Sequence, residues 1–272
     1  MEQMKSYDLM GNIALVRFSE TFKSRDKKKF AEKILKEQKG IKTVLEKVGK
    51  IKGRLRKMST KFIAGEDTKE VLYRENGCSF RFNIDKTYFS SRLSNERKEI
   101  ADLIKKDETV LVMFAGVAPF SIVIAKNSKA KKVYSNELNR EANKYAELNI
   151  GMNKLKGKVE LLNGDIKLIA KKIASGKILA GEKISIPKTF DVIVMPRPQL
   201  KDSFLKEAFS LSKKGTRIYY YDFVKIDEID SIVEKIKEEA SRVKKKVKIL
   251  KVKKAGELSP SKVRLRVDFQ VI

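Results

Sequence analysis

The stretch Val110–Lys126 (VLVMFAGVAPFSIVIAK) indicates how this chain folds. Its first residues form an apolar run typical of a buried strand, and the residues from Pro119 onward continue as an apolar helix. Gly116 lies between the two, and a glycine there lets the backbone come close to a ligand. Because ligands of open α/β sheets bind at the carboxyl ends of the strands, this turn is a candidate binding site.

Strands and helices alternate on both sides of this stretch. We expect strands at 109–113, 132–136, 158–162, 190–195 and 216–221, and helices at 96–105, from 119, at 140–153, from 201 and from 227. Strands separated by helices form mostly parallel sheets with right-handed crossovers. Two closing strands, 247–253 and 262–272, flank Gly256–Pro260 and predict an antiparallel hairpin at one edge of the sheet.

The first ninety residues have a different pattern, with strands expected at 12–18, 43–48 and 78–84 and an amphipathic helix near 27–36. We therefore predict two domains, a small α+β domain at residues 1–88 and a doubly wound α/β domain at 89–272. The second domain ends in the antiparallel hairpin.

The composition limits the chemistry and indicates the partner. The chain has 62 Lys and Arg against 35 Asp and Glu, a net charge of +27, which predicts salt-dependent binding to nucleic acid. The alternative is a lysine-rich or thermophilic surface, although thermophilic ion networks raise Lys and Glu together. No histidine and a single cysteine, Cys78, exclude an internal disulfide, Ser-His-Asp triads and Cys-His pairs.

No apolar run in the sequence is long enough to span a membrane, and the first residues do not lead into the core of a signal peptide. We therefore expect a cytoplasmic protein.

Two further strand ends carry acids. The second strand of the sheet ends at Glu137, about twenty residues after Gly116, where a carboxylate in such folds binds ribose hydroxyls. The third ends at Asp165, which would suit an adenine edge. Each acid alone is equally well explained as an N-cap or first-turn residue of the next helix. Together with the turn at Gly116, they favour a nucleoside pocket.

These motifs resemble a known family. VLVMFAGVAPFSI (110–122), VYSNELN (133–139), NGD (163–165) and FDVIVMPRP (190–198) are similar to successive motifs of class I S-adenosylmethionine-dependent methyltransferases. KTYFSSRLSNER (86–97) resembles the signature that precedes this Rossmann-like fold in archaeal and eukaryotic tRNA (guanine-N1-)-methyltransferases. The resemblance runs from about Tyr7 to the C-terminus and implies S-adenosylmethionine as cofactor and the anticodon stem-loop of tRNA as partner.

The resemblance also implies the reaction, methylation of N1 of guanosine at position 37 of tRNA. Glu137 and the Pro-x-Pro segment that starts at Pro196 resemble an archaeal subgroup that also methylates C7 of 4-demethylwyosine, which forms isowyosine. The cofactor contacts implied are Phe114, Gly116, Pro119, Phe120, Glu137, Leu138, Asp165 and Ile166. No metal is expected, since methyl transfer needs a base and an orienting site, and we expect a monomer.

Guanine N1 must lose its proton as it attacks the methyl group, and in a histidine-free chain a partly desolvated Glu is one of few available bases. Glu96 matches the general base of the family. Without the resemblance, Glu96 would be interpreted as pairing with Arg92 or Arg97 on an exposed helix turn. Arg56 matches the arginine that stabilises charge developing toward O6, although Arg54 and Lys57 leave the register open. The implied substrate contacts are Tyr88, Arg92, Asn139, Pro196 and Pro198.

Some positions depart from the family pattern. Pro196 replaces an asparagine, Ala118 a second glycine and Val112 an acid, which motivates a rival hypothesis of a non-catalytic RNA-binding protein on this scaffold. A second rival is aminocarboxypropyl transfer in wybutosine synthesis, although those enzymes typically carry Gly-Asn where this chain has Arg92 and Leu93. Family members also commonly carry a further small N-terminal domain, which this protein either lacks or carries outside this sequence. Without that domain, we expect tRNA docking to depend more on charge.

Overall fold

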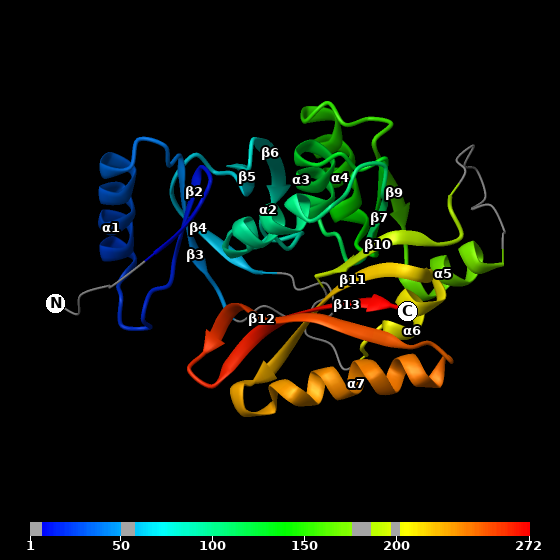
Figure 1. Ribbon diagram of the computed structural model, residues 1–272. Coiled ribbons are helices and arrows are strands. Elements are labelled where there is room, and N and C mark those ends of the chain that lie inside the picture. The colour runs from blue at the N-terminus through cyan, green and yellow to red at the C-terminus, as the bar shows by residue number, and fades with distance from the viewer. Residues whose placement is uncertain (1–6, 50–57, 176–185, 197–201) are drawn as a thin grey trace. The chain divides into compact units, whose positions relative to one another are not determined.

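The computed structural model describes residues 7–49, 58–175, 186–196 and 202–272. The chain divides into two compact units, Met1–Ser91 and Arg92–Ile272, which are described separately (Figure 1). The sequence placed the domain boundary at 88/89, three residues before the boundary between these units.

The first unit contains a four-stranded sheet in the order β1-β2-β3-β4 and a separate hairpin, β5-β6. Helix α1 connects the parallel strands β2 and β3, and its buried residues Ala31 and Ile34 pack into the apolar core of the unit. The strands predicted near 12, 43 and 78 and the helix are confirmed; β1, β4 and β5 were not predicted. The elements are β1 (Asp8–Met10), β2 (Ile13–Val16), α1 (Ser24–Glu37), β3 (Thr43–Lys47), β4 (Thr60–Gly65), β5 (Glu70–Glu75) and β6 (Cys78–Asn83).

An aromatic cluster anchors the segment that carries Tyr88 to the β5-β6 hairpin. The ring of Phe89 stacks on Phe82 at 4.7 Å and lies 5.0 Å from the ring of Tyr73. The hydroxyl of Thr87 donates to the carbonyl of Asn83 at 2.8 Å. Both neighbours of Tyr88 are therefore fixed within the first unit.

The second unit is built on a seven-stranded sheet in the order β12-β13-β11-β10-β7-β8-β9. Its five strands from β11 to β9 run parallel, and β13 and β12 add an antiparallel hairpin. This is the predicted doubly wound sheet with its C-terminal hairpin. The strands are β7 (Thr109–Val112), β8 (Lys132–Glu137), β9 (Val159–Asn163), β10 (Phe190–Met195), β11 (Ser212–Lys225), β12 (Val247–Ser259) and β13 (Lys262–Val271).

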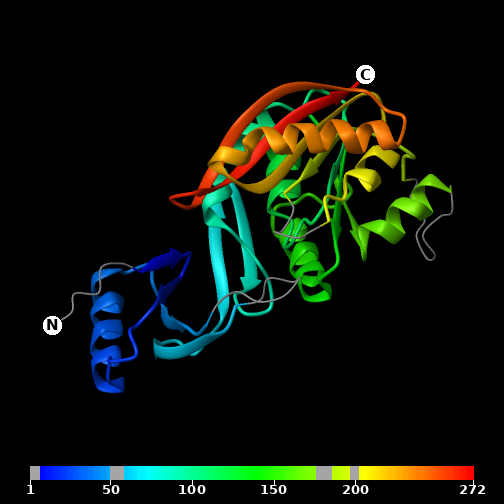
Figure 2. The ribbon, with the colours of Figure 1, turned by 90° about the horizontal axis from the view of Figure 1, so that it is seen from below.

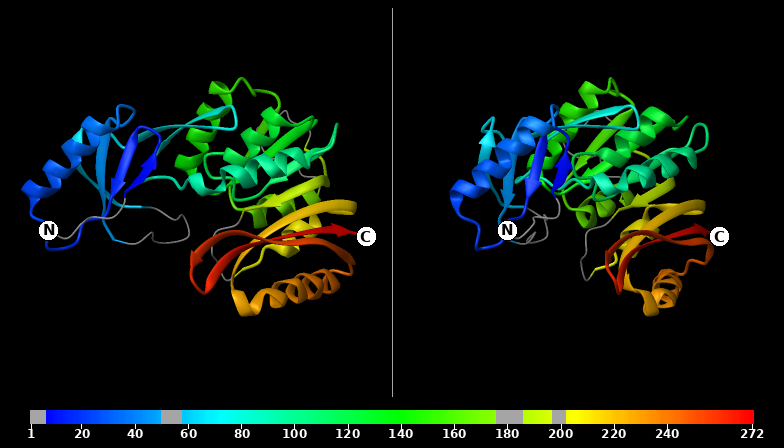
Figure 3. Two further views of the ribbon diagram at one scale, coloured as in Figure 1. Left: turned by 60° about the vertical axis from the view of Figure 1, so that its left-hand side comes forward. Right: turned by 90° about the vertical axis from the view of Figure 1, so that its left-hand side faces the viewer.

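Helices cover both faces of this sheet (Figures 1 and 3). Helices α5, α6 and α7 share one apolar core with the strands, whereas α2 packs against α3 on the other face. The sequence did not predict α5. The helices are α2 (Ser94–Asp102), α3 (Pro119–Asn127), α4 (Arg140–Met152), α5 (Ile166–Ala174), α6 (Leu205–Ser210) and α7 (Ile229–Arg242), with short 3-10 turns at Ser91–Leu93 and Ile226–Glu228. Within the described residues, no helix has the length and apolar character needed to cross a membrane.

The predicted turn at Gly256–Pro260 is wrong. Strand β12 continues to Ser259, and the turn consists of Pro260 and Ser261. Gly256, at φ +135°, lies instead where the register shifts between Lys254 and Glu257. Such a bulge favours a residue that tolerates this backbone angle, which explains why a glycine occurs inside the strand.

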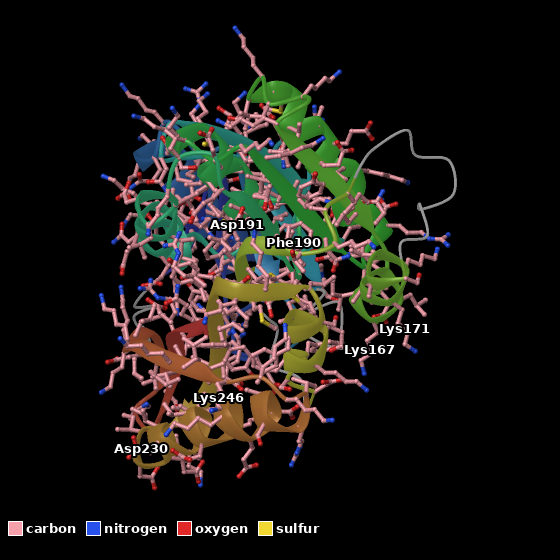
Figure 4. All side chains as sticks on the ribbon, turned by 45° about the vertical axis from the view of Figure 1, so that its right-hand side comes forward. Lys167, Lys171, Phe190, Asp191, Asp230 and Lys246 are labelled. Atoms are coloured by element: carbon pink, nitrogen blue, oxygen red, sulfur yellow. The ribbon has the colours of Figure 1, made fainter. Side chains whose placement is uncertain are left out.

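The parallel strands β7 and β10 are joined at their starting ends by Asp191, which is labelled in Figure 4 beside Phe190. The carboxylate of Asp191 accepts hydrogen bonds from the backbone and the hydroxyl of Thr109, both at 2.8 Å. This pairing fixes the register of the two central strands, so that their carboxyl ends meet at the opposite edge.

The two faces of β13 have different roles. Its apolar residues, predicted from their alternation, lie in the core shared with α6 and α7, and α7 runs along the antiparallel strands in Figure 2. The alternate face is also buried: Arg266 is 0% exposed and Asp268 5%. Helix α2 supplies the side chains that bind Arg266 there.

Candidate active site

Hydrogen bonds connect the carboxyl ends of four parallel strands, β7, β8, β9 and β10. The carboxylate of Glu137, at the end of β8, accepts from the amide of Gly116 at 2.8 Å, and its carbonyl accepts from the amide of Gly164 at 2.8 Å. The amide of Met113 bonds the carbonyl of Val194 on β10 at 2.9 Å. The three strand ends predicted to meet therefore do so, beside the switch point between β7 and β10 where ligands bind in such sheets.

Glu137 links the turn after β7 to the turn after β8. Its Oε2 accepts from Gly116 and its Oε1 accepts from the amide of Asn139 at 2.7 Å. The alternative that Glu137 is a helix cap is wrong, because the N-cap of α4 is Asn139. The same alternative is correct for Asp165, which caps α5 by accepting from the amide of Lys167 at 2.9 Å.

The turn after β7 has an unusual backbone. Phe114, Gly116 and Ala118 all have positive φ, at 58°, 59° and 65°. The left-handed conformation costs a residue with a Cβ about 1 kcal/mol, so the surrounding contacts must hold this shape. One such contact is the T-shaped packing of Phe114 on Phe204 at 4.9 Å. A turn of this kind, at the start of helix α3, fits the close approach of a nucleoside expected here.

The remaining cofactor residues inferred from the resemblance occupy different environments. Leu138 is half-buried next to Glu137. Pro119 and Phe120 begin α3 and are buried, and Ile166 is 2% exposed in the apolar core. The ring of Phe120 packs between the Arg97 guanidinium, at 5.7 Å, and the ring of Tyr221, at 6.0 Å. Phe120 therefore connects the turn to the residues around Glu96.

Glu96 belongs to a buried polar cluster between α2 and the antiparallel strands, which we call the α2–hairpin cluster: Glu96, Glu99, Tyr221, Lys253, Arg266 and Asp268. Tyr221, Arg266 and Lys253 are direct cross-strand neighbours on β11, β13 and β12. They form one row beneath α2, which presents Glu96 and Glu99.

Both carboxylate oxygens of Glu96 are engaged. Oε2 accepts from Arg266 Nη1 at 2.8 Å and from the Tyr221 hydroxyl at 3.0 Å, and Oε1 lies 2.7 Å from Lys253 Nζ. Glu96 is 7% exposed, so the alternative of an exposed turn is wrong, and these cations come from distant strands rather than from Arg92 or Arg97. Two cations and a hydroxyl stabilise a carboxylate that burial alone would disfavour.

Arg266 holds the cluster together. It donates to Glu96, to Glu99 Oε1 at 2.7 Å, and to both oxygens of Asp268 at 2.8 and 3.0 Å. Burial raises the pKa of Asp268 even though Arg266 opposes that rise. Burial and the adjacent Glu96 raise the pKa of Tyr221 well above 10, so its hydroxyl stays a donor at neutral pH.

Glu99 predicts how stability responds to acid. Burial would raise its pKa, but hydrogen bonds from Arg266 and Lys253 outweigh that effect and lower the pKa from 4.5 to about 2. The folded state therefore gains stability above pH 4.5 that is lost as the pH falls toward 2. Because the side chain is 33% exposed, solvent screening limits the gain to about 1 kcal/mol.

Urea unfolding of wild type and Glu99→Gln at several pH values measures this contribution. The free energies of unfolding should differ by about 1 kcal/mol at pH 7 and converge near pH 2. A difference that does not change with pH would show that the ion pairs of Glu99 contribute nothing.

The other inferred site residues belong to both units. Arg56 and Pro198 lie outside the described residues. Tyr88 is half-buried in the first unit, whereas Arg92 is exposed and Pro196 half-buried in the second. Asn139 is 7% exposed beside Glu137. The structure thus brings Asn139 and the turn at Gly116 together through Glu137.

Sequence reasoning missed most of the α2–hairpin cluster. Tyr221, Lys253, Arg266 and Asp268 lie on strands whose polar positions would ordinarily face water. Also missed was Lys167, labelled on α5 in Figure 4, which pairs with Asp202 at 2.5 Å and lies 5.3 Å from the ring of Phe204. No local pattern marks any of these residues.

Comparisons with known families cover nearly the whole chain. The TRM5/TYW2 methyltransferase domain matches residues 71–250, and the TYW2 N-terminal domain matches residues 1–68. The tRNA (guanine(37)-N(1))-methyltransferase Trm5b of Pyrococcus abyssi is 34% identical over 98% of this chain and 74% of its own length. The tRNA (guanine(37)-N(1))/4-demethylwyosine(37)-methyltransferase Taw22 of Nanoarchaeum equitans is 33% identical over 98% of this chain and all of its own length.

Solved structures agree with this assignment. The crystal structure of Pyrococcus abyssi Trm5b superposes with a TM-score of 0.81 at 32% identity, covering 98% of this chain and 75% of that one. A complex of aTrm5 with tRNALeu gives 0.79 at 26% identity, with coverage of 98% and 72%. Pyrococcus horikoshii TYW2 with MeSAdo gives 0.78 at 26% identity, with coverage of 98% and 91%. The chain belongs to the TRM5/TYW2 family of S-adenosylmethionine-dependent methyltransferases.

Proposed function

We propose that this protein transfers the methyl group of S-adenosylmethionine to N1 of guanosine 37 in tRNA, the reaction named for its relatives. The observation that carries the proposal is Glu96, a buried carboxylate held by Arg266, Lys253 and Tyr221. The Tyr221 side chain that donates to Glu96 also packs on the ring of Phe120, which belongs to α3, the helix that begins after the turn at Gly116. A base beside a nucleoside site is what N1 methylation requires.

S-adenosylmethionine supplies an electrophilic methyl group, and the carbon–sulfur electron pair stays on sulfur when that group leaves. The carboxylate of Glu96 accepts the proton of guanine N1. Arg56 stabilises charge that develops toward O6, and Tyr88, Arg92, Asn139, Pro196 and Pro198 hold the base after it leaves the anticodon-loop stack. Glu137 and the turn at Gly116 orient the methyl donor.

Two relatives favour a second substrate, 4-demethylwyosine at the same position of tRNA. Taw22 is named for both substrates, and this chain matches its full length. Taw21 of Saccharolobus solfataricus, named as a tRNA 4-demethylwyosine(37)-methyltransferase, is 30% identical over 80% of this chain. We propose that C7 of 4-demethylwyosine is methylated in the same site.

A single-turnover assay with labelled S-adenosylmethionine tests both activities. The substrates are tRNA transcripts with guanine or adenine at position 37 and a tRNA that carries 4-demethylwyosine there. Label should appear as N1-methylguanosine on the guanine transcript and as isowyosine on the tricyclic substrate, with none on the adenine transcript. Methylthioadenosine instead of S-adenosylhomocysteine in the spent cofactor would indicate aminocarboxypropyl transfer. No transfer despite tRNA binding would indicate a non-catalytic RNA-binding protein.

We propose that the enzyme is a cytoplasmic monomer that binds the anticodon stem-loop of tRNA. Its net charge of +27 favours association with the anticodon stem-loop.

A further inference from the structure

We propose that Oε1 of Glu96 is the atom that takes the substrate proton, and that Lys253 is a positioning residue whose charge lies against this oxygen. The inference rests on the proposed function and specifies its proton-transfer step. It follows from the unequal surroundings of the two carboxylate oxygens.

Oε2 is already saturated. It accepts from Arg266 Nη1 at 2.8 Å and from the Tyr221 hydroxyl at 3.0 Å. Arg266 is 0% and Tyr221 1% exposed, so neither donor can turn away to water. A carboxylate oxygen offers two lone pairs, and both lone pairs of Oε2 are occupied.

Oε1 has a different partner. Among the described residues it meets Lys253 Nζ, at 2.7 Å. Lys253 also binds Glu99 Oε2, and its side chain is 27% exposed, the most accessible of the groups on Glu96. Glu99 is itself fixed by Arg266 at 2.7 Å. Lys253 therefore remains anchored on Glu99 when a proton donor approaches Oε1, and Oε1 has a lone pair to receive that proton.

Charged side chains from several elements surround the carboxylate of Glu96. The charged or titratable groups in contact with Glu96 are Arg266 from β13, Lys253 from β12 and Tyr221 from β11. Asp268 from β13 and Glu99 from α2 bind the same cations. The ammonium of Lys253 is the charge nearest Oε1, and it favours the ionised carboxylate. The proton moves from N1 to Oε1, and the N–H electron pair remains on N1 for the new N–C bond.

The pH dependence of single-turnover methyl transfer to the guanine transcript tests this role. Lys253→Met removes the positive charge beside Oε1. The acid limb of the rate profile should move up by about one pH unit. Lys251→Met is the matched control, because Lys251 lies one row away, 56% exposed, and contacts Glu99 at 3.6 Å. Its profile should match wild type.

Two further variants separate charge from packing. Lys253→Arg keeps the charge and should restore the wild-type profile, whereas Lys253→Gln should reproduce the shift if the methionine variant does not fold. Thermal unfolding confirms that each variant is folded. A slower rate at every pH without a shift of the acid limb would overturn the proposal. If the wild type itself makes no N1-methylguanosine, the proposed function has failed, and that outcome is evident before any variant is tested.

Discussion

Glu96→Gln should lower the single-turnover rate of methyl transfer by about 10²- to 10⁴-fold, the range that a positioned general base supplies. The amide has nearly the same shape as the carboxylate and still accepts a hydrogen bond from Arg266, but it cannot take the proton of guanine N1. Affinity for S-adenosylmethionine, measured by calorimetry, should change little, because Glu137 and the turn at Gly116 lie elsewhere in the unit.

Glu99→Gln is the matched control for this experiment. Glu99 lies on the same helix and binds the same two cations, Arg266 and Lys253. If charge lost from the α2–hairpin cluster were the cause, both variants would slow the reaction alike. We expect the rate of the Glu99 variant to fall by less than about tenfold. A Glu96→Gln enzyme within a few-fold of wild type would make Glu96 a structural ion-pair residue and place the base elsewhere.

The central strands of the second unit, β7 and β10, could be predicted well because they are largely continuous apolar runs. Phe190–Met195 begins and ends where the sequence places it, and the turn at Gly116 lies at the predicted strand end. Strands buried on both faces have little polar pattern to confuse the interpretation. In the first unit β1 was missed because three residues are too few to show an alternation, whereas β4 and β5 were missed although each is as long as β10.

The surroundings of Glu96 could not be predicted from local pattern. In β13 the alternation of apolar residues correctly identifies one buried face. The same alternation would place the side chain of Arg266 on the opposite face, in contact with water. Whether a helix covers the second face depends on the strand order, which brings β13 between β11 and β12 beneath α2. The same tertiary order buries Glu96, which local pattern without the family resemblance would assign to an exposed helix turn. Contacts between residues 170 positions apart leave no trace in a short window.

Arg266→Met should lower the free energy of unfolding by about 3–5 kcal/mol at pH 7, as expected when one partner of a buried ion pair is removed. Arg266 is 0% exposed and binds Glu96, Glu99 and Asp268. Methionine fills part of the volume, but the carboxylate of Asp268 is left without the guanidinium that binds both of its oxygens. Urea unfolding of the full chain measures the loss.

Arg264→Met on the same strand provides the control. Arg264 is partly exposed and lies 5.1 Å from the ring of Phe223, an interaction worth about 0.5–1 kcal/mol. The cost of Arg266→Met should also fall as the pH is lowered, because Asp268, whose pKa burial already raises, can then take up a proton. If Arg266→Met and Arg264→Met lowered the free energy of unfolding by equally small amounts, water would have to reach the α2–hairpin cluster and screen its charges. Glu96 would then lack the dry, fixed surroundings on which its proposed role as a base depends.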